Sequence, residues 1–292
     1  ASLGTSAMEL VDKVLPQGKQ IALGVEAGAL SLRNAAALEA LGCTLTDIGP
    51  HVVEMRYLKD EEEQGYIREA GRLSVYAFEK TLEHAREGIS EMELEQRGTT
   101  ALFEYLGTDY PYHFSSPGCI TPSGPERTVM PHVYSNTRRL QQGDMVIHVR
   151  KPAVNGYYGE LERTFFIGQP SPEAERAFCA MLEAQTAVME AIRPGVTAGE
   201  MDRLGRDILR RYGYGDYAIH RIGHGMGLGR HEEPFLIANS HLVIEPGMVL
   251  TIEPGIYIPG LGGFRHSDTV LITTDGRENT TAFPNQLKDL IF

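Results

Sequence analysis

The chain has 292 residues, enough for about two domains of roughly 100 to 200 residues each. Its 42% apolar and 23% charged residues are ordinary globular values, which exclude a disordered, fibrous or coiled-coil protein. The formal net charge of -12 repels phosphate backbones and anionic lipids, so neither nucleic acid nor a membrane surface is the expected partner.

Cysteine usage and hydropathy indicate the compartment. Cys43, Cys119 and Cys179 are odd in number, widely spaced and without a CxxC pair, which is typical of a reducing cytoplasm. The sequence has no run of about 18 apolar residues and no basic segment followed by an apolar one near its start. We therefore expect a cytoplasmic protein that is neither exported nor inserted into a membrane.

The first residues predict a small α/β unit. A strand is predicted at 20–25, a helix at 30–41 and a second strand at 43–48. This βαβ-like unit is small for an independent domain, so we expect residues 1–57 to be the C-terminal part of a larger N-terminal domain.

The remaining residues, 58–292, predict an α+β domain with two similar halves. Apolar spacing and capping boxes predict helices at 60–87, 90–106, 172–192 and from 197 onward. Segments rich in β-branched and aromatic residues predict strands at 145–150, 157–167, 249–258 and 264–273. The order of two helices, strands, two helices and strands favours a curved antiparallel sheet covered by helices on one face.

Titratable and glycine-rich residues gather on these strands and their connections. The motifs in chain order are G-D-M-V at 143–146, N-G-Y-Y-G-E-L-E-R-T-F at 155–165, H-R-I-G-H-G-M-G-L at 220–228 and E-P-G-M-V-L-T-I-E-P-G-I-Y at 245–257. In this order they resemble the pita-bread family, which includes methionine aminopeptidase, aminopeptidase P, prolidase and creatinase. The resemblance implies a pita-bread catalytic domain over 58–292 and makes 1–57 the remnant of a creatinase-type N-terminal domain.

The peptidase members of that family hold two metal ions with two Asp, one His and two Glu, a donor set that suits Mn, Co or Zn. The family register places these five positions on Val149, Glu160, His224, Glu253 and Ser267. Val149 cannot bind a metal and Ser267 is a weak neutral donor, so too little negative charge remains for two dications. We therefore expect no metal cofactor. The alternative is a single Mn, Co or Zn ion on Glu160, His224 and Glu253.

Creatinase is the family member that works without metal, and its segment G-Y-Y-x-x-L-E-R-T resembles residues 156–164. The resemblance implies that His132, thirty residues before Glu162, is the general acid/base, and that Glu162 and Glu253 orient the substrate. A histidine with a near-neutral pKa can take a proton from water and pass it to a leaving nitrogen. The two carboxylates could hold a cationic group, or one could stay protonated as an acid.

The histidines also keep the spacing of the peptidase members. That spacing implies that His231 steadies a tetrahedral intermediate, which adds it to the predicted catalytic residues His132, Glu162 and Glu253. The predicted substrate-binding residues are His220, His224, Tyr157, Tyr158 and Arg265.

Three functions follow from these residues. The first is a metal-independent hydrolase of a C–N bond in a small substrate. The second is an Xaa-Pro dipeptidase or an aminopeptidase P-like metallopeptidase with altered ligands. The third is a catalytically inactive pita-bread domain that binds peptides or proteins. In the first two, the partner is a small molecule or a short peptide, and the resemblance implies a homodimer.

Overall fold

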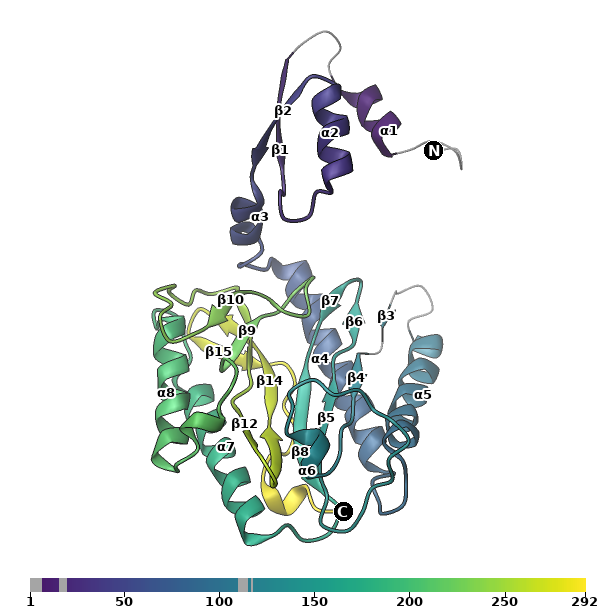
Figure 1. The fold of residues 1–292 in the computed structure, drawn as a ribbon, viewed down its shortest axis with the longest axis vertical. Helices are drawn as coiled ribbons and strands as arrows, with labels where there is room; N and C mark the ends of the chain where they lie inside the picture. Colours follow the sequence, from purple (N-terminus) through teal and green to yellow (C-terminus); the bar gives the residue numbers. More distant parts are fainter. Residues whose placement is uncertain (1–6, 16–19, 110–114, 117) are drawn as a thin grey trace. The chain divides into compact units, whose positions relative to one another are not determined.

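The computed structural model describes residues 7–15, 20–109, 115–116 and 118–292, and the chain divides into two compact units, Ala1–Arg56 and Tyr57–Phe292. The smaller unit contains helices α1, α2 and α3 and two parallel strands, β1 and β2 (Figure 1). Their bounds are α1 Ala7–Val14, β1 Ile21–Val25, α2 Leu32–Ala40, β2 Cys43–Asp47 and α3 Gly49–Met55. The strand–helix–strand order predicted for residues 20–48 is confirmed.

The larger unit carries two pairs of long helices, α4 with α5 and α7 with α8 (Figure 1). The helices are α4 Glu61–Leu82, α5 Glu91–Asp109, α6 Pro125–Thr128, α7 Pro172–Ala191 and α8 Ala198–Arg211, with single 3-10 turns at Gly215–Tyr217 and Leu287–Asp289. No helix in the part of the chain that the structure describes is long and apolar enough to cross a membrane.

Helix starts follow the sequence more closely than helix ends. The capping box predicted at Thr197 and Glu200 forms, and the hydroxyl of Ser90 accepts from the Glu93 amide at 3.2 Å. The helix end predicted at residue 106 is wrong, because Gly107 does not adopt positive φ and α5 continues through it to Asp109. The first long helix ends at Leu82 and not at residue 87.

The core of the unit is an eight-stranded antiparallel sheet in the order β10-β9-β11-β14-β8-β5-β4, with β15 paired to β14. Its strands are β4 Cys119–Ile120, β5 Met145–Arg150, β8 Leu161–Phe166, β9 Gly223–Gly225, β10 Glu232–Leu236, β11 Val249–Ile252, β14 Ser267–Thr273 and β15 Gly276–Asn279. Smaller sheets are formed by β3 Ser115–Ser116, β6 Ala153–Val154 and β7 Tyr157–Tyr158, and by β12 Gly255–Ile258 and β13 Gly262–Arg265. The pairing of β14 with β8 joins the two halves of the unit.

Three of the predicted strands are interrupted, and two of the breaks carry site residues. The strand predicted at 157–167 breaks at Gly159 and Glu160, where the Glu160 amide donates to Thr269 Oγ1 at 2.8 Å. The strand predicted at 249–258 breaks at Glu253 and Pro254, because proline has no N–H for a sheet ladder. The third break falls at His266.

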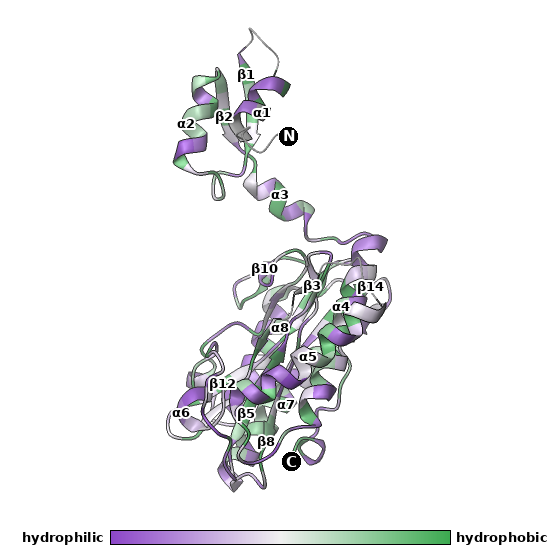
Figure 2. Ribbon diagram, turned by 90° about the vertical axis from the view of Figure 1, so that its right-hand side faces the viewer, coloured by the Kyte–Doolittle hydropathy of each residue, from purple (hydrophilic) through white to green (hydrophobic). Residues whose placement is uncertain are grey.

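Helix α4 packs closely against the first break. It buries Ile67, Ala70, Leu73 and Ala77, spaced three or four residues apart, and Figure 2 shows hydrophilic and hydrophobic residues alternating along α4 and α5. A Cβ atom at Gly159 would lie 2.6 Å from the Gly71 amide nitrogen, so only glycine fits between this strand break and the helix. The helix thereby fixes the position of the neighbouring Glu160.

Candidate active site

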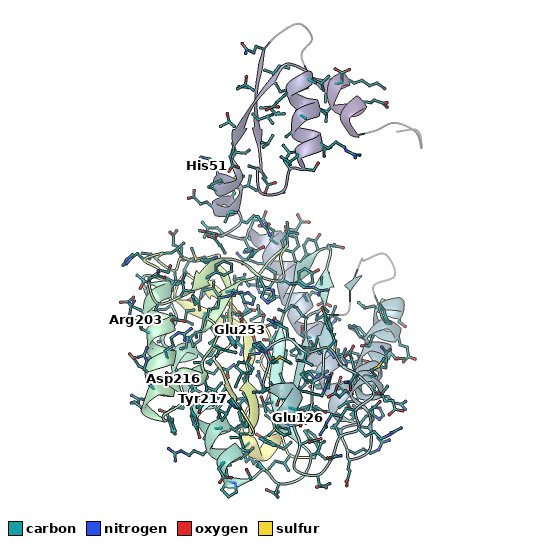
Figure 3. The ribbon with its side chains drawn as sticks, viewed as in Figure 1. His51, Glu126, Arg203, Asp216, Tyr217 and Glu253 are labelled. Atoms are coloured by element: carbon teal, nitrogen blue, oxygen red, sulfur yellow. The ribbon has the colours of Figure 1, made fainter. Side chains whose placement is uncertain are left out.

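A cavity of about 290 Å³ lies in the larger unit, and Figure 3 shows Glu253, one of its lining residues, near the middle of that unit among the strands. Residues from both halves of the sheet line the cavity: Gly118, Cys119, Ile120, His132, Tyr134, Val149, Lys151, Glu160, Glu162, Arg230, His231, Glu253 and Arg265. The cavity thus brings together all four predicted catalytic residues.

On one side of the cavity, a hydrogen-bonded chain runs from Glu162 to His220. Arg265 Nε donates to Glu162 Oε1 at 2.5 Å, and its Nη1 donates to the Tyr257 hydroxyl at 2.8 Å. The same hydroxyl lies 2.9 Å from His220 Nε2, while His220 Nδ1 donates to the Arg221 carbonyl at 2.7 Å. This arrangement makes Nε2 the acceptor of the hydroxyl proton, so the bonding fits a neutral His220.

Burial has the largest influence on the protonation of Glu162 and His220, the two ends of this series of hydrogen bonds. It raises the pKa of Glu162 to about 7 although the Arg265 guanidinium opposes the shift. Burial and the Arg265 charge lower the pKa of His220 to about 4. The Glu162 carboxylate pairs with Arg265 and not with the adjacent Arg163, which instead binds Asp268 at 2.9 Å in the interior.

On the other side, Glu160 is held at both of its oxygens. The Lys151 ammonium contacts Oε2, and the Ser267 hydroxyl donates to Oε1 at 2.7 Å. Both charged side chains are buried, with 11% of the Lys151 side chain and 2% of the Glu160 side chain exposed. Burial lowers the pKa of Lys151 to about 8, with the charges of Glu253 and Glu162 opposing that shift.

Between these groups lie His224 and Glu253. His224 Nδ1 donates to the Gly225 carbonyl at 2.8 Å, and its Nε2 lies 3.1 Å from Glu253 Oε1. This Nε2 is buried and has no hydrogen-bond partner among the described residues. Burial opposes ionisation of Glu253, but His224 and Arg265 outweigh it and hold the pKa of this carboxyl well below its usual range.

Two further histidines lead from the buried group towards solvent. The rings of His224 and His231 are 4.4 Å apart, and those of His231 and His132 are 5.9 Å apart and nearly perpendicular. Both His132 and His231 are exposed. Partial desolvation and the Arg265 charge lower the pKa of His132 below its ordinary value, so this ring is neutral and able to accept a proton at neutral pH.

Of the five predicted substrate-binding residues, Arg265 lines the cavity, whereas His220, His224, Tyr157 and Tyr158 do not. The Tyr157 hydroxyl donates to Glu63 Oε1 of α4 at 2.7 Å, and Tyr158 lies under the Arg230 guanidinium. The residues missed by the sequence reasoning are Lys151 and Arg230, which line the cavity, and Tyr257, which joins two site residues. Lys151 could have been found, because it lies two residues beyond Val149 and therefore faces the same side of the strand.

A helix-covered antiparallel sheet, with a charged cavity where its two halves meet, defines the class of pita-bread hydrolases. The model of Metallopeptidase family M24 matches residues 65–274, and the chain belongs to this family. The predicted pita-bread fold is thereby confirmed. The predicted enzyme class is confirmed as well, because the members of this family are hydrolases that cleave peptide C–N bonds.

The chain is 38% identical over 240 residues to an Xaa-Pro dipeptidase of Pyrococcus furiosus, covering 81% of this chain and 66% of that protein. It is 35% identical over 288 residues to the putative dipeptidase YkvY of Bacillus subtilis, covering 97% of this chain and 77% of that protein. The solved structure of the prolidase from Pyrococcus furiosus is 35% identical, with a TM-score of 0.83, covering 91% of this chain and 77% of that one. The chain therefore spans about two thirds to three quarters of the length of these relatives.

The residues present fit the metal pair of the family poorly. Glu160, His224 and Glu253 each offer a donor atom, and these atoms lie within 4.8 Å of one another, with the His224 nitrogen free of other hydrogen bonds among the described residues. One cation could bind there only if Lys151 moved away from Glu160. Two dications do not fit, because Val149 offers no donor atom and the Ser267 hydroxyl is already bound to Glu160.

Proposed function

We propose that the protein hydrolyses the C–N bond of dipeptides, with Xaa-Pro dipeptides as its first substrates. The observation that carries this proposal is the presence of both signs of charge in one small cavity. Glu162 and Glu253 offer carboxylates to an ammonium group, whereas Lys151, Arg230 and Arg265 offer cations to a carboxylate. A dipeptide carries both groups at its ends, and a volume of about 290 Å³ suits a ligand of that size.

The family relatives narrow the substrate. Both the curated Pyrococcus furiosus protein and a solved Bacillus anthracis structure, 34% identical to this chain, bear the name Xaa-Pro dipeptidase. This agreement favours the Xaa-Pro dipeptidase hypothesis over hydrolysis of an unrelated small molecule.

His132 serves this reaction as the general acid/base. Its neutral ring accepts a proton from the attacking water and returns it to the leaving nitrogen, while His231 lies beside it to contact the developing oxyanion. Arg265 orients Glu162, and Glu253 holds the substrate ammonium group. A single metal ion, if bound, would be held by Glu160, His224 and Glu253 and would supply Lewis-acid chemistry there.

A dipeptide panel tests the proposal. Purified protein is incubated with Xaa-Pro dipeptides, with the matching Xaa-Ala dipeptides and with Xaa-Pro-Ala tripeptides, and free amino acids are measured with and without a chelator. We expect release of free proline from the Xaa-Pro dipeptides, and less product from the other two sets. Binding of these peptides by calorimetry without any hydrolysis would reject the proposal in favour of a catalytically inactive binding domain.

A further inference from the structure

A buried lysine occupies the part of the site where the family register places negatively charged ligands. Lys151 follows strand β5 and faces the cavity on the same side as Val149, because side chains two apart on a strand share a face. The intervening Arg150 points to the opposite side, where it donates to Thr99 and Thr81 at 2.8 and 2.7 Å. The strand therefore delivers an ammonium group directly into the cavity.

The Lys151 ammonium forms an ion pair with Glu160, the carboxylate that a metal ion would need as a ligand. It contacts one oxygen of Glu160, and the Ser267 hydroxyl binds the other oxygen. A dication entering at Glu160, His224 and Glu253 would have to displace the ammonium from a buried ion pair and then lie beside its charge. Breaking a buried pair leaves one charge uncompensated, which is strongly unfavourable.

We propose that the Lys151 ammonium replaces the metal ions of the family as the built-in positive charge of this site. Two features disfavour a metal here. Val149 and Ser267 provide no strong ligand at their positions, and Lys151 neutralises Glu160, the acidic ligand that remains in the first half of the sheet. The Arg265 guanidinium compensates the charge of Glu253, whose Oε1 also lies 3.1 Å from His224 Nε2. The site is thus charge-compensated by side chains alone.

The same group has a role in hydrolysis, a part of the inference that rests on the proposed function. An ammonium carries three N–H donors, and its hydrogen bonds to described residues go to Glu160 and, at 3.5 Å, to the Arg230 carbonyl. The third N–H can donate to the scissile carbonyl oxygen. Water then adds to the carbonyl carbon as His132 takes its proton, the C–N bond breaks, and that proton passes to the leaving nitrogen, which yields an acid and an amine.

Metal binding by the intact chain tests this inference without any activity assay. The wild-type protein and the Lys151→Gln variant are equilibrated at neutral pH with Mn²⁺, Co²⁺ or Zn²⁺ in turn, and bound metal is measured by elemental analysis and calorimetry. We expect the wild type to retain less than about 0.1 ion per chain and Lys151→Gln to bind about one, because Glu160 is released as a ligand. Lys288→Gln, a change at an exposed lysine, is the matched control and should behave as the wild type.

Two outcomes would overturn the inference: tight binding of one or two ions by the wild type, or no gain of metal in a folded Lys151→Gln variant. If that variant does not fold, the wild-type measurement still tests the inference, because tight binding of metal by the wild type overturns it. Hydrolysis by the wild type should also persist in a chelator. If the dipeptide panel shows no turnover at all, the proposed function fails, whereas the metal titration still tests Lys151.

Discussion

The two halves of the sheet contribute different chemistry to one cavity. The second half supplies His224 and Glu253, both of the types that the metallopeptidase register requires. In the first half, the apolar Val149 stands at one ligand position. Glu160 stands at the other and is paired with the Lys151 ammonium. A sheet can therefore keep its register across both halves while the first half exchanges a metal-binding surface for an ion pair and the second half loses one ligand at Ser267.

The largest expected effect concerns the catalytic group of the first half. His132→Ala should lower kcat/KM for an Xaa-Pro dipeptide by about 10²–10⁴, because the variant loses the ring that accepts the proton of water. Steady-state kinetics measure this loss, and His241→Ala, a change at an exposed histidine outside the cavity, serves as control. Equal activity in both variants would remove His132 from the mechanism.

A second change restores the metal-binding register in both halves. The combined variant Val149→Asp, Lys151→Gln and Ser267→Glu adds two carboxylates and removes the ammonium, so it should bind about two Mn²⁺ ions per chain. Elemental analysis after gel filtration gives the stoichiometry. A folded variant that still binds no metal would show that these three residues are not what disfavours the metal pair.

The ion pair that joins the halves should matter for stability. Arg265→Gln leaves Glu162 buried without its partner and should lower the free energy of unfolding by about 3–5 kcal/mol at pH 8. The loss should shrink at lower pH, because the Glu162 carboxyl, with a pKa already near 7, becomes neutral. Urea unfolding at two pH values measures both effects. Arg139→Gln, at an exposed pair with Glu93, should change little, and an equal loss in both variants would argue against a special role for the buried pair.

The smallest expected effect concerns the pH dependence of kcat/KM. In Glu162→Gln, which removes one titrating carboxyl, kcat/KM should fall towards acid as His132 gains a proton. Because the pKa of His132 is lowered, this decline should be centred below the ordinary value of 6.5. A decline centred at or above 6.5, measured over about pH 5 to 8, would contradict the assigned environment of His132.

The sequence predicted the fold well and the electrostatics of the site only in part. Helix starts at Ser90 and Thr197 carry local capping signals, and the motifs place His132, Glu162 and Glu253 in register with a known family. The strand break at Glu160 depends on a partner far along the chain, Thr269, whereas the break at Glu253 has a local cause in Pro254 that the sequence analysis did not use. The partners of Lys151 and Arg265 could not be read from local sequence, because each ion pair joins residues that only the folded sheet brings together.

One crystallographic experiment tests the central claim most directly. Crystals of the wild-type protein grown with Mn²⁺ are measured at the manganese absorption edge. The ion-pair account predicts no anomalous peak between Glu160, His224 and Glu253, and density for Lys151 Nζ in contact with Glu160. Two anomalous peaks at that position, with the Lys151 side chain turned away, would contradict it.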